Sequence, residues 1–361
     1  MSRTLEAITS PRSLASGKVD NQTMKAVRIH KYGGPEVLQS EDLPRPQVSA
    51  ATEVLIRVHA AGVNPVDSAI RRGLVKEIFP VSLPWIPGSD VSGVIEEVGP
   101  DVTRFKKGDE VFALLNPAKG GAYAEYVVVS ESELALKPKS LHHIRAAAVP
   151  VAAVTAWNAL FETAQLQSGQ RVLIQGGAGG VGHFAVQLAK RKGAHVIATA
   201  SAKNHELVYE LGADEVIDYQ AQKFEDVARK IDIVLDSIGG DTQERSWKVL
   251  KKGGVLVSIV QPPSGEKARS VGARGAMVQS RPDGAKLAEI AKIIDSGQLA
   301  PVINRILPLS EARRAQELSQ SGHMHGKIVL RVVNHNGGNS HDTRSQQGHR
   351  TYDWSRFSIV C

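Results

Sequence analysis

Cysteine is almost absent from this sequence: the one cysteine among 361 residues is Cys361, at the C-terminal end. An intramolecular disulfide bond is therefore excluded, and the composition fits a reducing compartment. On this ground we expect a cytoplasmic protein. Structural zinc sites are built mostly from Cys and His ligands, so a four-cysteine zinc site is excluded as well.

Long apolar runs and dense charge runs are also missing. No uninterrupted apolar segment reaches the roughly 18–20 residues that a membrane-spanning helix needs, so we expect no membrane insertion. The formal net charge is +7, but the basic residues are scattered and do not alternate with aromatic ones. We therefore expect no nucleic-acid partner, and we interpret the charge as a solvated surface that suits a phosphate-bearing ligand.

The histidines do not have the spacing of a metal site. His59, His142, His143, His183 and His195 form no ligand-like pattern with carboxylates along the chain. We interpret them as structural or surface residues and expect no bound metal.

The hydrophobic pattern changes along the chain and predicts separate domains. Over residues 24–149, short β-rich runs such as 54–58, 91–98 and 123–129 are broken by Gly and Pro, which is typical of a barrel or sandwich. Over residues 150–281, strands alternate with helices, which predicts a parallel sheet with helices on both faces. Residues 282–333 contain two helical stretches and a final strand.

Both ends of the chain lack a periodic pattern. We expect residues 1–23 and 334–361 to be disordered tails outside the fold. The first segment contains Arg and Ser, as a transit peptide would, but it also carries Glu6 and Asp20 and has no clear amphipathic face.

A glycine-rich segment lies between a predicted strand at 171–175 and a predicted helix that ends near residue 192. Its residues are Gly177, Ala178, Gly179, Gly180, Val181 and Gly182. In this setting the first glycine permits a tight turn, the second lets the backbone approach a pyrophosphate, and the last lets the helix pack against the strand. Since a helix N-terminus offers free N–H groups, the segment predicts a bound dinucleotide.

The end of the next strand indicates which dinucleotide binds. NAD enzymes usually place Asp or Glu there for the ribose 2′-hydroxyl, but this chain has Ser201, Lys203 and Asn204. No carboxylate repels a 2′-phosphate, and these side chains offer hydrogen bonds and a positive charge. We therefore predict NADPH.

The motifs together resemble the medium-chain dehydrogenase/reductase superfamily, within it the zinc-free quinone oxidoreductase branch. The resemblance covers about residues 24–333 and is carried by the glycine segment and by four further motifs: Gly-Val-Asn-Pro-Val-Asp at 62–67, Pro-Gly-Ser-Asp-Val-Ser-Gly at 87–93, Gly-Ala-Tyr-Ala-Glu-Tyr at 121–126 and Thr-Ala-Trp at 155–157. It implies a GroES-like β-barrel catalytic domain, a Rossmann doubly wound parallel sheet, and a C-terminal segment that returns to the first domain. It also implies a homodimer.

The resemblance further implies roles for single residues. Zinc-dependent relatives have Cys where this chain has Asn64, and a His-Glu pair where it has Ser89 and Asp90. The remaining residues implied to lie near the cofactor are Asn64 itself beside the nicotinamide, Thr155 behind its carboxamide, Tyr219 at the adenosine phosphate end, Ser237, Ile238 and Ile259 around the ribose and ring, and Lys327.

The chemistry that remains without zinc is reduction of a conjugated acceptor. Relatives that protonate a substrate carbon have a tyrosine shortly after the Asn-Pro turn, but residues 67–73 contain none. We therefore expect an NADPH-dependent quinone reductase acting on a small molecule, with Asn64 catalytic and Tyr123 as a substitute proton donor. The alternatives are a 2-alkenal or enone double-bond reductase, and a non-catalytic NADPH-binding protein.

Overall fold

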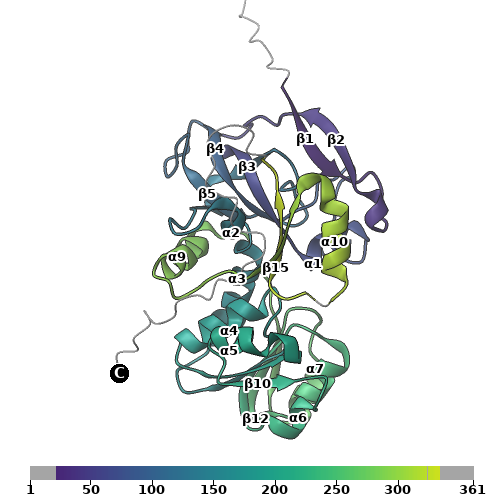
Figure 1. Cartoon of the computed structure of the whole chain (residues 1–361), viewed down its shortest axis with the longest axis vertical. Helices are drawn as coiled ribbons and strands as arrows, with labels where there is room; N and C mark the ends of the chain where they lie inside the picture. The colour runs from purple at the N-terminus through teal and green to yellow at the C-terminus, as the bar shows by residue number, and fades with distance from the viewer. Residues whose placement is uncertain (1–21, 323, 334–361) are drawn as a thin grey trace, which may run out of the picture.

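Two large β-sheets organise the part of the chain that the computed structural model describes, residues 22–322 and 324–333. Figure 1 shows one sheet in the upper part of the molecule and the other in the lower part, with strand β15 running from one toward the other. The expected tails lie outside the described residues, except that residues 22 and 23 are described and Thr23 begins the first strand.

The upper sheet is mixed and has the strand order β14-β15-β3-β4-β5-β7, with β6 paired to β3. All of its pairs are antiparallel except β14 with β15. A separate antiparallel pair, β1 with β2, lies beside it. The bounds are β1 Thr23–Arg28, β2 Gln39–Pro44, β3 Glu53–Val63, β4 Asp90–Val98, β5 Glu110–Leu114, β6 Tyr126–Ser130, β7 Leu134–Leu136, β14 Ile303–Pro308 and β15 Lys327–Arg331.

The lower sheet is entirely parallel and has the order β10-β9-β8-β11-β12-β13. Because β9 follows β8 on one side and β11 lies on the other, the order reverses between β8 and β11, which is where doubly wound sheets bind ligands. The bounds are β8 Arg171–Ile174, β9 His195–Ala200, β10 Glu215–Asp218, β11 Ile231–Asp236, β12 Leu250–Ser258 and β13 Arg274–Met277.

Helices complete both parts. Their bounds are α1 Pro65–Arg71, α2 His143–Ala146, α3 Pro150–Trp157, α4 Gly182–Arg191, α5 His205–Glu210, α6 Phe224–Val227, α7 Gly240–Ser246, α8 Gly265–Ser270, α9 Gly284–Asp295 and α10 Ala312–Gln320, and a π-helical turn spans Asn158–Thr163. Short 3-10 helices cover η1 Pro35–Val37, η2 Glu131–Glu133, η4 Ala202–Asn204 and η5 Leu309–Glu311.

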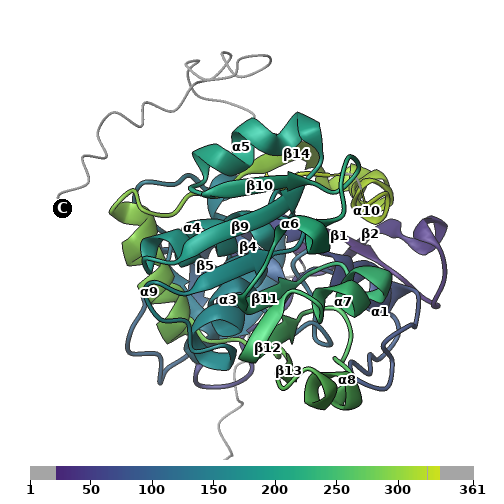
Figure 2. The same ribbon diagram turned by 90° about the horizontal axis from the view of Figure 1, so that it is seen from below.

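Alternation along each parallel strand builds a core on both faces of the lower sheet. In β8, Val172 and Ile174 pack with Phe184 of α4, whereas Leu173 between them packs on the other face with Phe224 of α6. Successive side chains of a strand point to opposite faces, so continuous apolar strands are covered by helices twice. Figure 2 shows this sheet from below, with α5 beyond β10 at one edge and α8 near β13 at the other.

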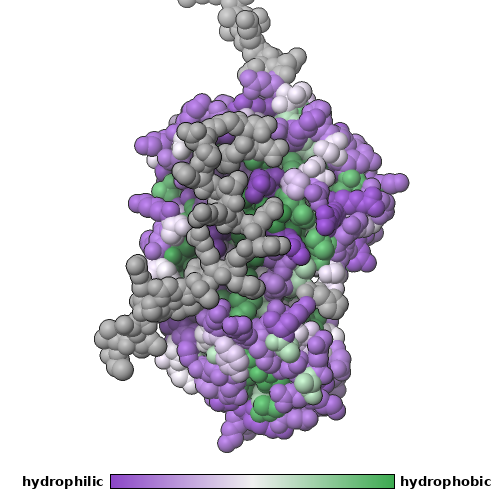
Figure 3. Space-filling view, viewed as in Figure 1, coloured by the Kyte–Doolittle hydropathy of each residue, from purple (hydrophilic) through white to green (hydrophobic). Residues whose placement is uncertain are grey.

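The C-terminal segment joins both parts of the molecule. Helix α9 contributes Leu287 and Ile290 to a core that also contains Phe112 of β5, and β15 adds Ile328 and Leu330 to the core of the mixed sheet. Hydrophilic residues dominate the outline of the face in Figure 3, and apolar ones show mainly inside it.

One helical stretch has the length and mean hydropathy of a membrane-spanning segment. It covers residues His143–Thr163; an 18-residue window within it has a mean hydropathy of 1.4, and 72% of that window is buried inside the fold. The packing of α3 against α4 and α9 explains its apolar character, because it lies in the core between the two sheets.

Several elements differ from the sequence-based expectation. The strand predicted from residue 123 begins only at Tyr126, because the backbone of Tyr123 donates its N–H to Pro87 O instead of joining the ladder. Helix α1 and strands β13 and β14 were not predicted, since they are short and lack a strong apolar period.

Candidate active site

The glycine segment forms the turn between β8 and α4. Gly176 has a positive φ of 72°, so the turn conformation lies one residue before Gly177. A Cβ at Gly177 would lie 2.7 Å from the Cβ of Ala198, and one at Gly182 would lie 2.1 Å from Gly176 O. Glycine is therefore required at Gly177 and Gly182 because strand, turn and helix approach each other closely.

Two polar residues that the sequence did not single out hold this turn in place. Thr199 accepts the N–H of Gly176 on its Oγ1 at 2.9 Å and donates to Gln175 Oε1 at 2.9 Å, while its carbonyl accepts the N–H of Gly177. Helix α4 then begins at Gly182, so its N-terminus, the positive end of the helix dipole, lies at this turn. The turn fits the phosphates of a dinucleotide.

The residues expected to choose the cofactor follow β9 directly. Ser201 precedes the short helix η4, Lys203 is exposed on it, and the Asn204 side chain donates to Ser201 Oγ at 3.1 Å. Burial, and then the positive charges of Lys203 and Arg305, lower the pKa of His325. Lys203 and Arg305 thus act together in the region that follows β9.

The remaining expected cofactor residues follow the other parallel strands. Tyr219 follows β10 and is 53% exposed, and Ile238 is 56% exposed in the turn after β11. Ser237 donates its hydroxyl to Gln175 O at 2.7 Å, which ties this turn to the one after β8. Ile259 follows β12 and donates its N–H to Asp236 O. All lie at the carboxyl edge of one sheet.

Asp236 organises that edge and was missed by the sequence analysis. Its buried carboxylate accepts the N–H groups of Ile238 and Gly239 at 3.0 and 2.8 Å and the side chains of Gln243 and Ser258 at 2.9 and 2.8 Å. Four hydrogen bonds to one carboxylate fix the turn after β11. An apolar strand that ends in Asp, followed by Gly-Gly, is the signal that could have indicated it.

Asn64 lies in the mixed-sheet part, at the turn between β3 and α1. Its backbone N–H donates to Asp67 Oδ2 at 2.9 Å, and Asp67 also accepts the hydroxyls of Ser89 and Tyr123 at 3.2 and 3.3 Å. Burial, together with the negative charge of Asp90, raises the pKa of Asp67 to about 7. The carboxyl of Asp67 thus fixes the turn that carries Asn64.

Tyr123 is completely buried, and its hydroxyl points to Asp67. Burial, and then the negative charge of Asp67, raise the pKa of the Tyr123 phenol well above its usual value. Through its contact with Asp67, Tyr123 helps to fix the turn that carries Asn64.

Lys327, the first residue of β15, reaches the side chain of Asn64. Its Nζ donates to Asn64 Oδ1 at 2.5 Å and to Asp90 Oδ2 at 3.2 Å, and Asn64 Nδ2 donates to the same Asp90 oxygen at 2.9 Å. The other Asp90 oxygen accepts the N–H of Val151, the second residue of α3, at 2.6 Å. An amide, a carboxylate and an ammonium therefore form one buried cluster.

This cluster adjoins the glycine turn. The N–H of Gly326 donates to Ala178 O at 2.8 Å, and a Cβ at Gly180 would lie 3.5 Å from Lys327 Cδ. The structure thus brings Asn64 and Lys327 together with the expected dinucleotide turn, although they come from opposite ends of the chain. Thr155, on α3, pairs with Ser280 Oγ at 2.9 Å.

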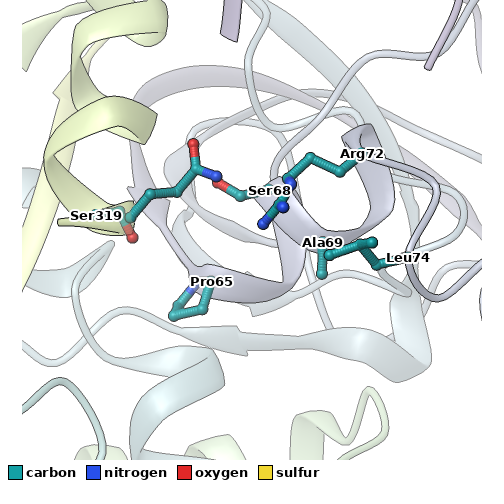
Figure 4. A pocket seen from close by; sticks show the side chains of 7 residues that line it. Pro65, Ser68, Ala69, Arg72, Leu74 and Ser319 are labelled. Atoms are coloured by element: carbon teal, nitrogen blue, oxygen red, sulfur yellow. The ribbon is translucent and has the colours of Figure 1, made fainter. Parts of the chain in front are cut away.

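A cavity of about 300 Å³ lies between α1 and α10 (Figure 4), and Pro65, which follows Asn64 in the chain, is one of its lining residues. It combines apolar and polar walls, which suits an organic molecule with a polar group. Its lining residues are Pro65, Ser68, Ala69, Arg72, Leu74, Ser319 and Gln320.

The residues at the Asn64 turn do not fit a zinc ion. Asn64, Ser89 and Asp90 offer only oxygen and amide groups, and the ammonium of Lys327 already contacts two of them. Among residues 22–322 and 324–333, no group of three or more His, Cys, Asp or Glu side chains is arranged to hold a metal.

Comparisons with known proteins match both parts of the chain. Family models match residues 50–139, described as an alcohol dehydrogenase GroES-like domain, and residues 211–330, described as a zinc-binding dehydrogenase. The mitochondrial NAD(P)H oxidoreductase RTN4IP1 of Danio rerio is 36% identical, over 89% of this chain and 95% of its own length. The chloroplastic NADPH-dependent alkenal/one oxidoreductase of Arabidopsis thaliana is 38% identical, over 85% and 79% respectively.

Solved structures agree. The quinone oxidoreductase from Coxiella burnetii has a TM-score of 0.81 and 37% identity, and the match covers 86% of this chain and 100% of that one. The expectation of a Rossmann sheet combined with a GroES-like domain is thereby confirmed.

The expectation of a cytoplasmic location is wrong. Four RTN4IP1 relatives are named as mitochondrial, and others are named as chloroplastic. The error has a physical reason: a low cysteine content indicates a reducing environment, and the cytoplasm is not the only compartment whose interior keeps thiols reduced.

The identity to whole relatives and the shared architecture decide the family. The chain belongs to the medium-chain dehydrogenase/reductase family, among its NAD(P)H and quinone oxidoreductases.

Proposed function

We propose that this protein is an NADPH-dependent oxidoreductase that reduces quinones without zinc. The observation that carries the proposal is the contact between the glycine turn and the cluster of Asn64, Asp90 and Lys327. A dinucleotide held at the glycine turn would bring its hydride donor to the cluster, whose side chains do not fit a zinc ion. Without a Lewis acid to polarise an alcohol, reduction of an electron-poor acceptor is the chemistry that fits.

The residues available for the cofactor lie along one sheet edge. The glycine turn, with Gly179, Gly180 and Val181 at its centre, would hold the pyrophosphate, and the turns after β9, β11 and β12 would hold the two ribose ends. When bound, reduced nicotinamide supplies a hydride. The protein contributes position, exclusion of water and hydrogen bonds to the oxygen that gains negative charge.

The choice of NADPH is supported by Lys203, which is exposed just after β9. We expect Lys203→Gln to raise the KM for NADPH about ten- to a hundredfold, since a charged hydrogen bond is lost, and to leave the KM for NADH unchanged. Lys248→Gln is the matched control, because Lys248 is exposed and lies just before β12. It is therefore at the amino ends of the parallel strands, whereas Lys203 follows the carboxyl end of β9. Equal KM values for both cofactors in the wild type would contradict the choice.

Two features favour quinones over enones. Residues 67–73 contain no tyrosine, and the Tyr123 hydroxyl is committed to Asp67 in the interior. Reduction of an enone carbon–carbon bond requires a proton on carbon, whereas the oxygens of a reduced quinone take protons from water. The lack of an available proton donor at these two places therefore matters less for quinones.

Reduction of alkenals or enones is the second candidate. It is supported by relatives that are 38% identical and are named 2-methylene-furan-3-one reductase and alkenal/one oxidoreductase. Both reactions need the same cofactor and the same hydride transfer. They differ only in the protonation that follows.

A panel of acceptors tests the proposal. The full-length protein is assayed with NADPH and with NADH against menadione, 1,4-benzoquinone, 2-hexenal and 3-buten-2-one, and products are identified. We expect hydroquinones with NADPH. Turnover of the enones alone would support the second candidate, and saturable NADPH binding without any turnover would indicate a non-catalytic binding protein.

A further inference from the structure

Lys327 is a buried cation. Its side chain is 3% exposed, and that of its partner Asp90 is fully buried. Taking an ammonium out of water is costly unless charge and hydrogen bonds compensate for it. An arrangement of this kind keeps a positive charge at a fixed place inside the protein.

The hydrogen-bond partners of the Lys327 ammonium do not occupy all of its N–H groups. An ammonium carries three N–H donors. Within the described residues, Asn64 Oδ1 and Asp90 Oδ2 accept from Lys327 Nζ. One N–H is left to donate to a further acceptor, and Asn64 and Asp90 fix where the nitrogen lies.

The place of this donor is set by the glycine turn. The Lys327 side chain passes Gly180, and the preceding residue is bonded to Ala178. The ammonium therefore lies where the dinucleotide turn meets the Asn64 turn. The proposed function requires negative charge to be stabilised close to this place.

We propose that the Lys327 ammonium stabilises the negative charge that the reaction places on the acceptor. It thereby performs the task that zinc performs in zinc-dependent relatives. Its third N–H donates to the carbonyl oxygen of the acceptor. The C–H bond of the reduced dinucleotide breaks, and its hydride, which carries two electrons, goes to one oxygen of the quinone while the dinucleotide becomes oxidised. The oxygen on the opposite side of the ring becomes an oxyanion held by Lys327, and a proton from water then completes the hydroquinone. This inference rests on the proposed reductase function.

The family model that includes Lys327 is described as zinc-binding, which sharpens the contrast. A metal and an ammonium cannot both contact the same Asn64 and Asp90 oxygens, since like charges repel at such short range. A fixed ammonium polarises a carbonyl more weakly than a metal does, so it suits acceptors that are already electron-poor.

The test compares Lys327→Met and Lys327→Arg with the wild type. We expect Lys327→Met to lower kcat on the order of a hundredfold, as loss of one oxyanion donor does, while the Kd for NADPH measured by fluorescence changes less than about threefold. Lys327→Arg keeps the charge and is expected to recover part of kcat. Lys137→Met is the control, since Lys137 is another buried lysine, bonded to Leu141 O and paired with Glu110.

A second readout separates catalysis from structure. If Lys327 stabilises the oxyanion, its loss should slow electron-rich, low-potential quinones more than electron-poor ones, whereas a folding defect slows all of them equally. Should Lys327→Met fold poorly, Asn64→Asp replaces it: a second carboxylate at the ammonium weakens its stabilisation of the acceptor's negative charge and is expected to lower kcat with the same dependence on the acceptor.

The opposite results overturn the inference. They are an unchanged kcat in Lys327→Met, a weakened Kd for NADPH that accounts for the whole loss, or a loss independent of the acceptor. A wild-type protein that reduces no acceptor would refute the proposed function itself, which distinguishes the two failures.

Discussion

At the scale of single residues, Asp67 shows what the sequence could and could not indicate. The motif at 62–67 marked its surroundings as functional, and the prediction that Asn64 lies beside the nicotinamide stays a prediction; the structure places its side chain in a cluster with Asp90 and Lys327. The role of Asp67 could not be predicted, because its raised pKa depends on complete burial and on Asp90, which begins β4 and follows helix α1 in the chain. Burial of one carboxyl is a property of the folded structure.

Asp67 predicts a pH dependence of stability. Since the folded pKa of about 7 lies above the usual value of 3.8, the folded protein holds a proton that the unfolded chain has lost between these pH values. The contribution of Asp67 to the free energy of unfolding is therefore complete below about pH 4 and decreases by about 1.4 kcal/mol per pH unit until about pH 7. Asp67→Asn should lack this decrease.

Urea unfolding of both proteins at pH 4.5, 5.5, 6.5 and 8 measures the effect. The difference between them is the informative quantity, because His183, whose pKa burial lowers to about 3, contributes an opposite trend to both. Parallel profiles in the two proteins would show that Asp67 does not titrate in this range.

At the scale of elements, the strand, glycine turn and helix at the dinucleotide site were predictable to within a residue or two. The expected strand at 171–175 is observed as β8 Arg171–Ile174, and the helix expected from residue 181 begins at Gly182. The residue that makes the turn was not predictable, because neighbouring glycines are equivalent in sequence and only the backbone path gives Gly176 its positive φ. The short edge strands β13 and β14 were missed because they have little apolar period.

Gly182→Ala tests the close contact of turn and helix. The added Cβ would lie 2.1 Å from Gly176 O, so the helix must move away from the turn. We expect a loss of about 1–3 kcal/mol in the free energy of unfolding and NADPH binding weakened at least tenfold. Gly265→Ala is the matched control at the first residue of α8, where the new Cβ meets only the end of Arg269 at 3.5 Å. Similar effects of both would contradict the explanation.

At the scale of the whole molecule, the parallel sheet has two strands with one free edge each, β10 and β13. The family resemblance implies a homodimer through such an edge, and we propose that β13 forms it. Met277 of this strand is 40% exposed, which is consistent with a covered position in an assembly. The sequence could not select an edge, since strand order is visible only in the folded sheet.

Sedimentation analysis at micromolar concentrations tests this assembly. We expect the wild type to sediment as a dimer and Met277→Asp to dissociate at least tenfold more readily, because a charge on an edge strand opposes pairing. Tyr209→Asp, on α5 beside the other edge, should remain dimeric. Dissociation by Tyr209→Asp alone would place the contact at β10 instead.

Strand β15 also determines when during synthesis the protein becomes complete. Lys327 and Asn64 are 263 residues apart in the chain, and β15 inserts between β14 and β3. All residues before Lys327 must therefore be synthesised before the described upper sheet can close, so folding of that sheet waits for β15. A product that stops short of Lys327 would lack the buried cation and one sheet strand together. On the proposed function, termination at that point yields an inactive protein rather than an enzyme with altered specificity.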